Sequence, residues 1–228
     1  YADQQGTCLS ELIGGTRASV ECGISIGIPP SIDDLIGNVV QAMETGFRRV
    51  KLKVMPGWSA EPVGAVRAHF PGIRITVDGN GSFDADDLDE LVALERYDLL
   101  FVEQPFPEDD LVLHARLQAR METPICLDES IISAGDVDTA LRLDACRVVN
   151  IKVGRVGGIW NAKAIHDRCL DAGIPVWCGG LMETGIGQSE SLALASLPGC
   201  VFPADIGPSE RYFRDDIMYV GPMEDGKI

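Results

Sequence analysis

Charged residues end the apolar segments of this chain at a nearly constant interval. Lys53, Asp78, Glu103, Asp128 and Lys152 each close a short apolar run, and they lie 25, 25, 25 and 24 residues apart. An interval of that length holds one strand, one helix and the two connections between them. The sequence therefore predicts a chain built from one repeated strand-loop-helix unit.

The apolar runs show little polar alternation, which is typical of strands covered on both faces. Ser31 with Asp34 suggests a helix start, and Gly46 before the next run fits a left-handed helix stop. Eight strands with helices between them predict an α/β fold, a (β/α)8 TIM-type barrel, with an open doubly wound sheet as the alternative. The strand candidates are 19–28, 49–54, 73–78, 99–103, 125–128, 148–153, 175–178 and 200–205.

Composition excludes several classes of protein. With 228 residues and 46% apolar content, the chain can bury one large core. A net charge of −16 disfavours nucleic acid and anionic membranes as partners, and no apolar run reaches the roughly 20 residues of a bilayer span. Seven cysteines without a CxxC pair indicate buried thiols in a reducing compartment, so we expect a cytoplasmic protein.

The charged strand ends predict a metal site. In a barrel the carboxyl ends of all strands meet at one mouth, whereas the alternative is that these charges merely face solvent. Asp78, Glu103 and Asp128 on neighbouring strands would repel one another without a cation, and oxygen ligands select Mg²⁺, for which Mn²⁺ can substitute. His69, His114 and His166 all fall in helix-like segments and are expected to pack or face solvent.

Lysines flank the predicted metal site. Lys51 and Lys53 are two residues apart on one strand and therefore point to the same face. Two close ammonium groups disfavour each other's charge, which favours a neutral amine that can act as a base. Lys152 approaches from the other side of the metal, and this arrangement suits proton removal next to a carboxylate.

The chain resembles the enolase superfamily, specifically its muconate-lactonizing branch and, within it, the o-succinylbenzoate synthase/N-acylamino acid racemase group. The resemblance covers nearly the whole chain. It rests on the ordered motifs KLK (51–53), DGN (78–80), VEQP (102–105), LDES (127–130), NIKVGRVGG (150–158), GGLMETGIG (179–187), FPADI (202–206) and SERYF (209–213).

The resemblance implies a role for each candidate residue. Asp78, Glu103 and Asp128 would bind Mg²⁺, Lys53 would take the α-proton, and Lys152 would face the opposite side of the substrate. Lys51 would tune Lys53, and Asn80 and Glu129 would support the site. The substrate contacts implied after the seventh strand are Gly179, Gly180 and Met182. The stretch 154–158 is not a full phosphate loop, so we expect no nucleotide cofactor.

Members of the family carry an α+β capping domain before the barrel, and we expect this chain to lack it. We expect residues 1–17 to be its tail or a linker, 18–206 the catalytic barrel, and 207–228 a segment that packs toward the cap and is partly exposed without it. The start at Tyr1 rather than Met also points to a fragment or a processed product.

The resemblance implies Mg²⁺-dependent syn dehydration of a cyclohexadiene carboxylate in menaquinone biosynthesis. N-acylamino acid racemisation uses the same residues and stays open. Dipeptide epimerase and cycloisomerase are less favoured, because an epimerase is expected to carry Asp-x-Asp where this chain has Asp205-Ile206-Gly207. Alternatives of another class are a Schiff-base aldolase using Lys53 or Lys152 and an inactive barrel fragment. We expect a small carboxylate substrate, a homo-oligomer and a separate capping domain as partners.

Overall fold

The computed structural model describes residues 2–228, which divide into two compact units. The central unit comprises residues 24–130 and 138–148. The terminal unit comprises residues 2–23, 131–137 and 149–228 and therefore contains both ends of the described chain.

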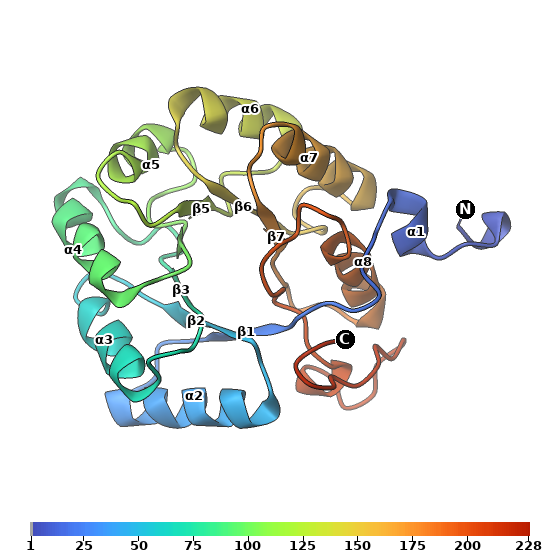
Figure 1. The fold of residues 1–228 in the computed structure, drawn as a ribbon, viewed down its shortest axis with the longest axis horizontal. Helices are drawn as coiled ribbons and strands as arrows, with labels where there is room; N and C mark the ends of the chain where they lie inside the picture. The colour runs from blue at the N-terminus through green and yellow to red at the C-terminus, as the bar shows by residue number, and fades with distance from the viewer. Residues whose placement is uncertain (1) are drawn as a thin grey trace. The chain divides into compact units, whose positions relative to one another are not determined.

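The central unit alternates strands with helices, as the charge interval predicts. Its strands follow one another in the sheet in chain order, and α2, α3, α4 and α5 lie on their outer side (Figure 1). The strands are β1 (Gly23–Ile26), β2 (Arg49–Lys53), β3 (Ile75–Asp78), β4 (Val102–Glu103) and β5 (Ile125–Leu127). The helices are α2 (Ile32–Thr45), α3 (Ala60–His69), η2 (Ala85–Asp87), α4 (Leu88–Val92), η3 (Ala93–Tyr97) and α5 (Leu111–Gln118); α6 (Ala134–Leu143) has residues in both units.

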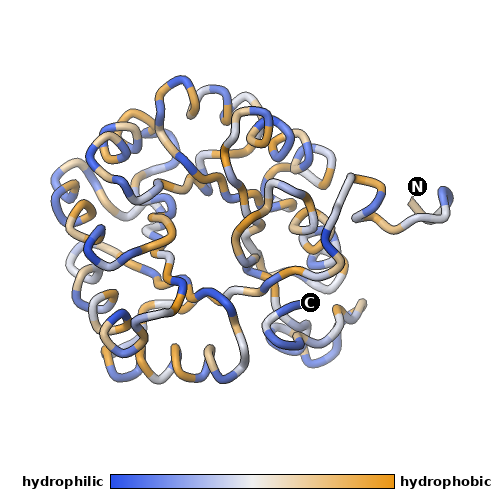
Figure 2. The backbone as a smooth tube through the Cα atoms, in the orientation of Figure 1, coloured by the Kyte–Doolittle hydropathy of each residue, from blue (hydrophilic) through white to orange (hydrophobic). Residues whose placement is uncertain are grey.

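Helix α2 forms where the sequence places its signals. The hydroxyl of Ser31 accepts a hydrogen bond from the amide of Asp34 at 3.1 Å, which satisfies a free N–H at the first turn. Gly46 ends the helix at φ 100°, in the left-handed region. Leu35 and Val39 are buried, and hydrophobic and hydrophilic residues alternate along the helix (Figure 2).

The register of the parallel strands sets the height of the charged strand ends. Lys53 pairs with Asp78, and Asp78 pairs with Glu103, so these three lie level with one another. Glu103 pairs with Cys126, which places Asp128 two residues farther toward the carboxyl end of β5. Because side chains alternate along a strand, a step of two keeps the same face. The charged residues therefore lie level at the ends of β2, β3 and β4, whereas Asp128 lies two residues beyond that level.

The terminal unit carries the remaining elements. The parallel strands β6 (Val148–Ile151) and β7 (Val176–Cys178) pair with each other, with Asn150 opposite Trp177. Helix α1 (Leu9–Ile13) contacts α8, and α7 (Ile159–Asp171) also contacts α8. The other helices are η1 (Asp3–Gln5), α8 (Gly185–Ala195) and η4 (Ser209–Arg211).

The eighth predicted strand, 200–205, is not a regular strand in the described part of the chain. It forms isolated parallel bridges instead, Val176 to Cys200 and Cys22 to Ala204. Pro203 interrupts it and cannot donate to a ladder. The segment nevertheless bonds β7 on one side and residues 21–23 on the other, and so takes the place of an eighth strand.

Hydrogen bonds hold the C-terminal segment, 207–228, at its last residue and near its middle. Val20 and Ile228 exchange backbone hydrogen bonds at 2.7 and 3.0 Å. A carboxylate oxygen of Asp216 accepts from the amide of Gly185 at the first turn of α8, 2.9 Å away. Ile217 stays 76% exposed. The segment is therefore partly exposed along its length, with Glu210, Ile217 and Lys227 among its exposed residues.

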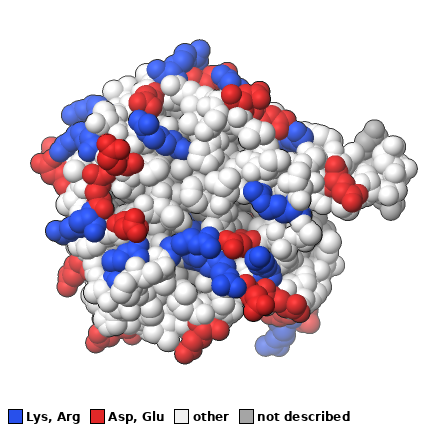
Figure 3. All heavy atoms as spheres, viewed as in Figure 1, with Lys and Arg blue, Asp and Glu red and all other residues white. Residues whose placement is uncertain are grey.

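Acidic side chains are dispersed over the face shown in Figure 3 and do not form one patch. The seven cysteines, all within the described residues, form no disulfide, and all but Cys8 are buried. Among residues 2–228, no helix combines the length and hydrophobicity that crossing a bilayer requires.

Candidate active site

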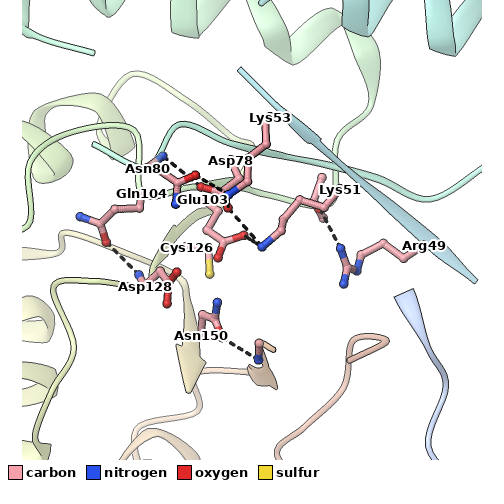
Figure 4. A network of polar contacts seen from close by, with 12 residues as sticks. Arg49, Lys51, Lys53, Asp78, Asn80, Glu103, Gln104, Cys126, Asp128 and Asn150 are labelled. Atoms are coloured by element: carbon pink, nitrogen blue, oxygen red, sulfur yellow. Dashed lines mark hydrogen bonds and ion pairs between the residues drawn. The ribbon is translucent and has the colours of Figure 1, made fainter. Parts of the chain in front are cut away.

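Lys51 and Lys53 direct their ammonium groups to the same carboxylate of the central unit (Figure 4). Both lie within β2, and their Nζ atoms are 3.1 and 2.6 Å from Oδ2 of Asp78. Lys51 also lies 3.0 Å from Oε2 of Glu103. The Lys51 side chain is 4% exposed and that of Lys53 is 29% exposed, so solvent and ligands reach Lys53 more easily. The same-face prediction for the two lysines is confirmed.

The three predicted ligand carboxylates are buried at the carboxyl ends of successive strands. Asp78 ends β3, Glu103 ends β4, and Asp128 directly follows β5; each is at most 1% exposed. Buried carboxylates need positive partners, because removing a charge from water costs several kcal/mol. Lys51 and Lys53 supply this charge for Asp78, and Lys51 supplies it for Glu103.

The donor set fits a hard divalent cation. Among residues 2–228, no three His, Cys, Asp or Glu side chains lie close enough together to hold a metal ion. Two ammonium groups lie against Asp78 and Glu103 instead, and the three carboxylates together with these two groups keep one net negative charge. A divalent cation, with one lysine charged and the other neutral, would balance the three carboxylates. Oxygen donors suit Mg²⁺.

Asn80 and Glu129 lie beside these groups in the central unit. The Asn80 side-chain oxygen accepts from Nζ of Lys53, and its amide nitrogen donates to Oε1 of Glu129 at 2.9 Å. The backbone amide of Asn80 donates to Oδ1 of Asp78 at 3.0 Å. Asn80 therefore links the predicted base, one predicted ligand and Glu129.

Lys152 and the turn at Gly179 and Gly180, here called the glycine turn, belong to the terminal unit. Lys152 directly follows β6 and is partly buried. One turn glycine, Gly179, donates its amide to Oδ1 of buried Asn150 at 2.8 Å. A Cβ on Gly179 would lie 2.4 Å from that oxygen, and one on Gly180 would lie 2.1 Å from the carbonyl oxygen of Asp205. Both glycines thus allow close packing within the protein.

Two neighbours of the glycine turn differ in exposure. The side chain of Met182 is 82% exposed, so it is available for contact with a ligand or another chain. Burial raises the pKa of Glu183 above its usual value, while a hydrogen bond from Ser191 and the positive charge of Lys152 oppose that rise. Glu183 was not singled out from the sequence, although it lies inside the GGLMETGIG motif.

The three histidines lie in helices, as predicted. His69 is at the end of α3, and His166 is buried in α7, where its Nε2 accepts the amide of Gly199 at 3.1 Å. His114 is buried in α5, and burial lowers its pKa.

Comparisons with known proteins agree with this fold and motif set. Residues 34–228 match the model of the family described as enolase C-terminal domain-like. The chain is 44% identical over 218 residues to an o-succinylbenzoate synthase of Geobacillus kaustophilus, covering 96% of this chain and 58% of that protein. It is 46% identical over 206 residues to an N-succinylamino acid racemase of Amycolatopsis, covering 90% of this chain and 56% of the racemase.

Solved structures give the same result. A probable mandelate racemase of Alicyclobacillus acidocaldarius superposes with a TM-score of 0.96 at 43% identity, over 100% of this chain and 60% of that one. A dipeptide epimerase of Enterococcus faecalis, solved with Mg and the dipeptide L-Leu-L-Tyr, gives a TM-score of 0.86 at 26% identity, over 95% of this chain and 62% of that one.

The chain spans less than two thirds of the length of each of these proteins. The family match covers most of the chain, and it confirms both the predicted fold class and the resemblance. The chain therefore belongs to the enolase C-terminal domain-like family.

Proposed function

We propose that the protein containing this chain is an o-succinylbenzoate synthase, with N-succinylamino acid racemisation as a second activity. The main support is that Lys51 and Lys53 both form ion pairs with Asp78 at the carboxyl ends of parallel strands. A synthase and a racemase, each at least 44% identical to the chain, support both activities. The substrate is a small carboxylate with an acidic α-proton.

Asp78, Glu103 and Asp128 would hold Mg²⁺, or Mn²⁺ in its place. Bound there, the metal would act as a Lewis acid that stabilises negative charge developing on the substrate carboxylate. Lys51, wedged between two of the three carboxylates, keeps their charge balanced and their positions fixed.

Lys53 is the proposed base. As a neutral amine it takes the α-proton and becomes an ammonium group. Asp78 Oδ2, 2.6 Å away, and the side-chain oxygen of Asn80 accept hydrogen bonds from that ammonium. The proton therefore arrives at a nitrogen whose charged form already has two acceptors, which makes the transfer less costly.

Lys152 would have a different role in each of the two reactions. In dehydration Lys53 takes the α-proton and returns it to the β-hydroxyl, which leaves on the same face as water, so one base suffices and Lys152 stabilises charge as a cation. Racemisation removes the proton on one face and returns it on the other, so it needs both lysines as acid and base. Lys152→Ala should therefore affect racemisation more deeply than dehydration.

The test is NMR in D₂O with Mg²⁺ on the full-length protein. It follows dehydration of the synthase substrate and α-deuteration of each enantiomer of an N-succinylamino acid. We expect Lys53→Ala to abolish deuteration of one enantiomer and Lys152→Ala that of the other. If the wild type shows no water loss and no deuterium uptake, the proposed function is refuted.

Partners and compartment follow the same reasoning. The exposed side chains of Met182 and Ile217 suit contact with a separate capping domain or another subunit, and we propose both, the latter as a homo-oligomer. Seven cysteines without a disulfide suit a reducing cytoplasm. In a bacterium with such relatives, the synthase product would enter menaquinone biosynthesis.

A further inference from the structure

Gln104 is a buried side chain that connects the strand ends carrying the predicted metal ligands. It follows Glu103 directly and is 1% exposed. Its Oε1 accepts from the backbone amides of Asp128 at 2.8 Å and Ser130 at 3.3 Å. Its Nε2 lies 2.8 Å from Oγ of Ser130 and 3.0 Å from the carbonyl oxygen of Phe106. Figure 4 shows Gln104 reaching Asp128.

The surroundings fix which way this amide points. His114 places Nδ1 2.8 Å from the carbonyl of Asp110, so Nδ1 carries the hydrogen and Nε2 is an acceptor. That Nε2 lies 3.3 Å from Nε2 of Gln104. A flipped amide would set its NH₂ group against two backbone N–H donors, and its oxygen against the carbonyl of Phe106. Only the observed orientation satisfies the groups around it.

The backbone of Gln104 makes two further connections. Its N–H donates to the carbonyl of Cys126 at 2.8 Å, and its C=O accepts from Gly81 at 2.8 Å. Gln104 thus forms hydrogen bonds to Gly81 in the loop after Asp78 and to the backbone of Asp128. It also follows Glu103 directly in the sequence. Its φ is +33°, in the left-handed region that residues with a Cβ seldom adopt. Such a conformation persists only where its surroundings hold it, and it is concentrated at functional sites.

We infer that Gln104 is a positioning residue that sets the spacing of Asp78, Glu103 and Asp128 for a divalent cation. This inference rests on the proposed function, because it takes those three carboxylates as the ligands. Gln104 has no part in the proton transfer. It acts through the backbone that carries each ligand, chiefly through the hydrogen bond from its Oε1 to the amide of Asp128.

A second buried glutamine provides a matched control. Gln118 is 2% exposed, its Oε1 accepts from the amide of Ile125 at 2.7 Å, and its Nε2 lies 3.1 Å from the carbonyl of Met121. It therefore braces the amino end of β5, whereas Gln104 braces the carboxyl end of the same strand. Gln104→Leu and Gln118→Leu both remove a buried amide that accepts a backbone N–H, and only the first borders the predicted ligands.

The experiment measures Mg²⁺ affinity by calorimetry and melting temperature in EDTA, in the full-length wild type and both variants. We expect both substitutions to lower the melting temperature. Only Gln104→Leu should weaken Mg²⁺ binding, by about 10- to 100-fold, which is the scale for outer residues that orient metal ligands. The pair Gln104→Asn and Gln118→Asn keeps an amide at each site and replaces the leucine pair if the latter does not fold.

The outcomes separate this inference from the proposed function. Normal Mg²⁺ binding by the wild type, with equal affinities in the Gln104 and Gln118 variants, overturns the positioning role and leaves the proposed function standing. Failure of the wild type to bind Mg²⁺ overturns both. A drop in turnover with unchanged Mg²⁺ affinity also counts against the inference, because it would show that Gln104 acts on the substrate.

Discussion

Lys53 and Asp78 occupy paired register positions on β2 and β3, and Nζ of the lysine lies 2.6 Å from Oδ2 of the aspartate. The predicted base is therefore held on a predicted metal ligand. Lys51, two residues earlier, contacts the same oxygen from 3.1 Å. Because the three side chains touch, a substitution that removes one of their charges should alter both metal binding and proton transfer, whereas one that keeps the charge can separate the two.

Lys53→Ala should lower turnover by about 10² or more, the usual scale for loss of a general base. Lys53→Arg keeps a positive charge beside Asp78 but stays protonated at neutral pH, so it should retain Mg²⁺ binding and still lose turnover. Lys163→Ala is the control, because that lysine forms a partly exposed ion pair with Asp167 on α7. Near-normal turnover in both Lys53 variants would remove it from the role of base.

Glu103→Gln should weaken Mg²⁺ binding by at least about tenfold, because an amide oxygen carries less negative charge than a carboxylate. The variant also leaves Lys51 with one carboxylate contact fewer. Calorimetric titration with Mg²⁺ measures the effect, and Glu44→Gln on the exposed side of α2 serves as control. Equal affinities in the two variants would contradict the metal assignment.

His114 should make the protein less stable as the pH falls. Burial lowers its pKa below 6.5, so the unfolded chain binds a proton at a pH where the folded chain does not. Its contribution is complete above pH 6.5 and is lost as the pH falls toward the lowered pKa. Melting temperatures between about pH 7.5 and pH 5.5 should fall less in His114→Gln than in the wild type. Parallel curves for the two proteins would show that His114 does not titrate in this range.

Gly185→Ala should loosen the C-terminal segment. A Cβ at this position would lie 1.7 Å from the carbonyl oxygen of Met218, so the backbone must move, at a cost of about 1–3 kcal/mol. Thermal denaturation and limited proteolysis within 207–228 report the change. Gly37→Ala in α2 is the matched control, because its Cβ would meet nothing within 4 Å and should stabilise the helix by about 0.5–1 kcal/mol. A melting temperature unchanged by Gly185→Ala would mean that the segment is already loose there.

The local features of the fold follow from the sequence. The interval between charged strand ends predicts the alternation of strands and helices, because one β-loop-α unit has a narrow range of lengths. The shared face of Lys51 and Lys53 follows from the period of a strand, and the ends of α2 follow from Ser31 and Gly46. These features depend on residues within a few positions of one another.

Only the tertiary structure decides which distant groups meet. The register between β4 and β5 sets Asp128 two residues beyond the partner of Glu103, although their spacing in sequence equals the earlier intervals. The position of Gln104 depends on hydrogen bonds to residues 81, 126 and 128. The turn at Gly179 depends on a hydrogen bond to Asn150, which lies 29 residues earlier in the sequence. Hydrogen bonds between segments form only after the chain has paid the entropy of closing each loop. Their partners are therefore selected by packing and register rather than by local sequence.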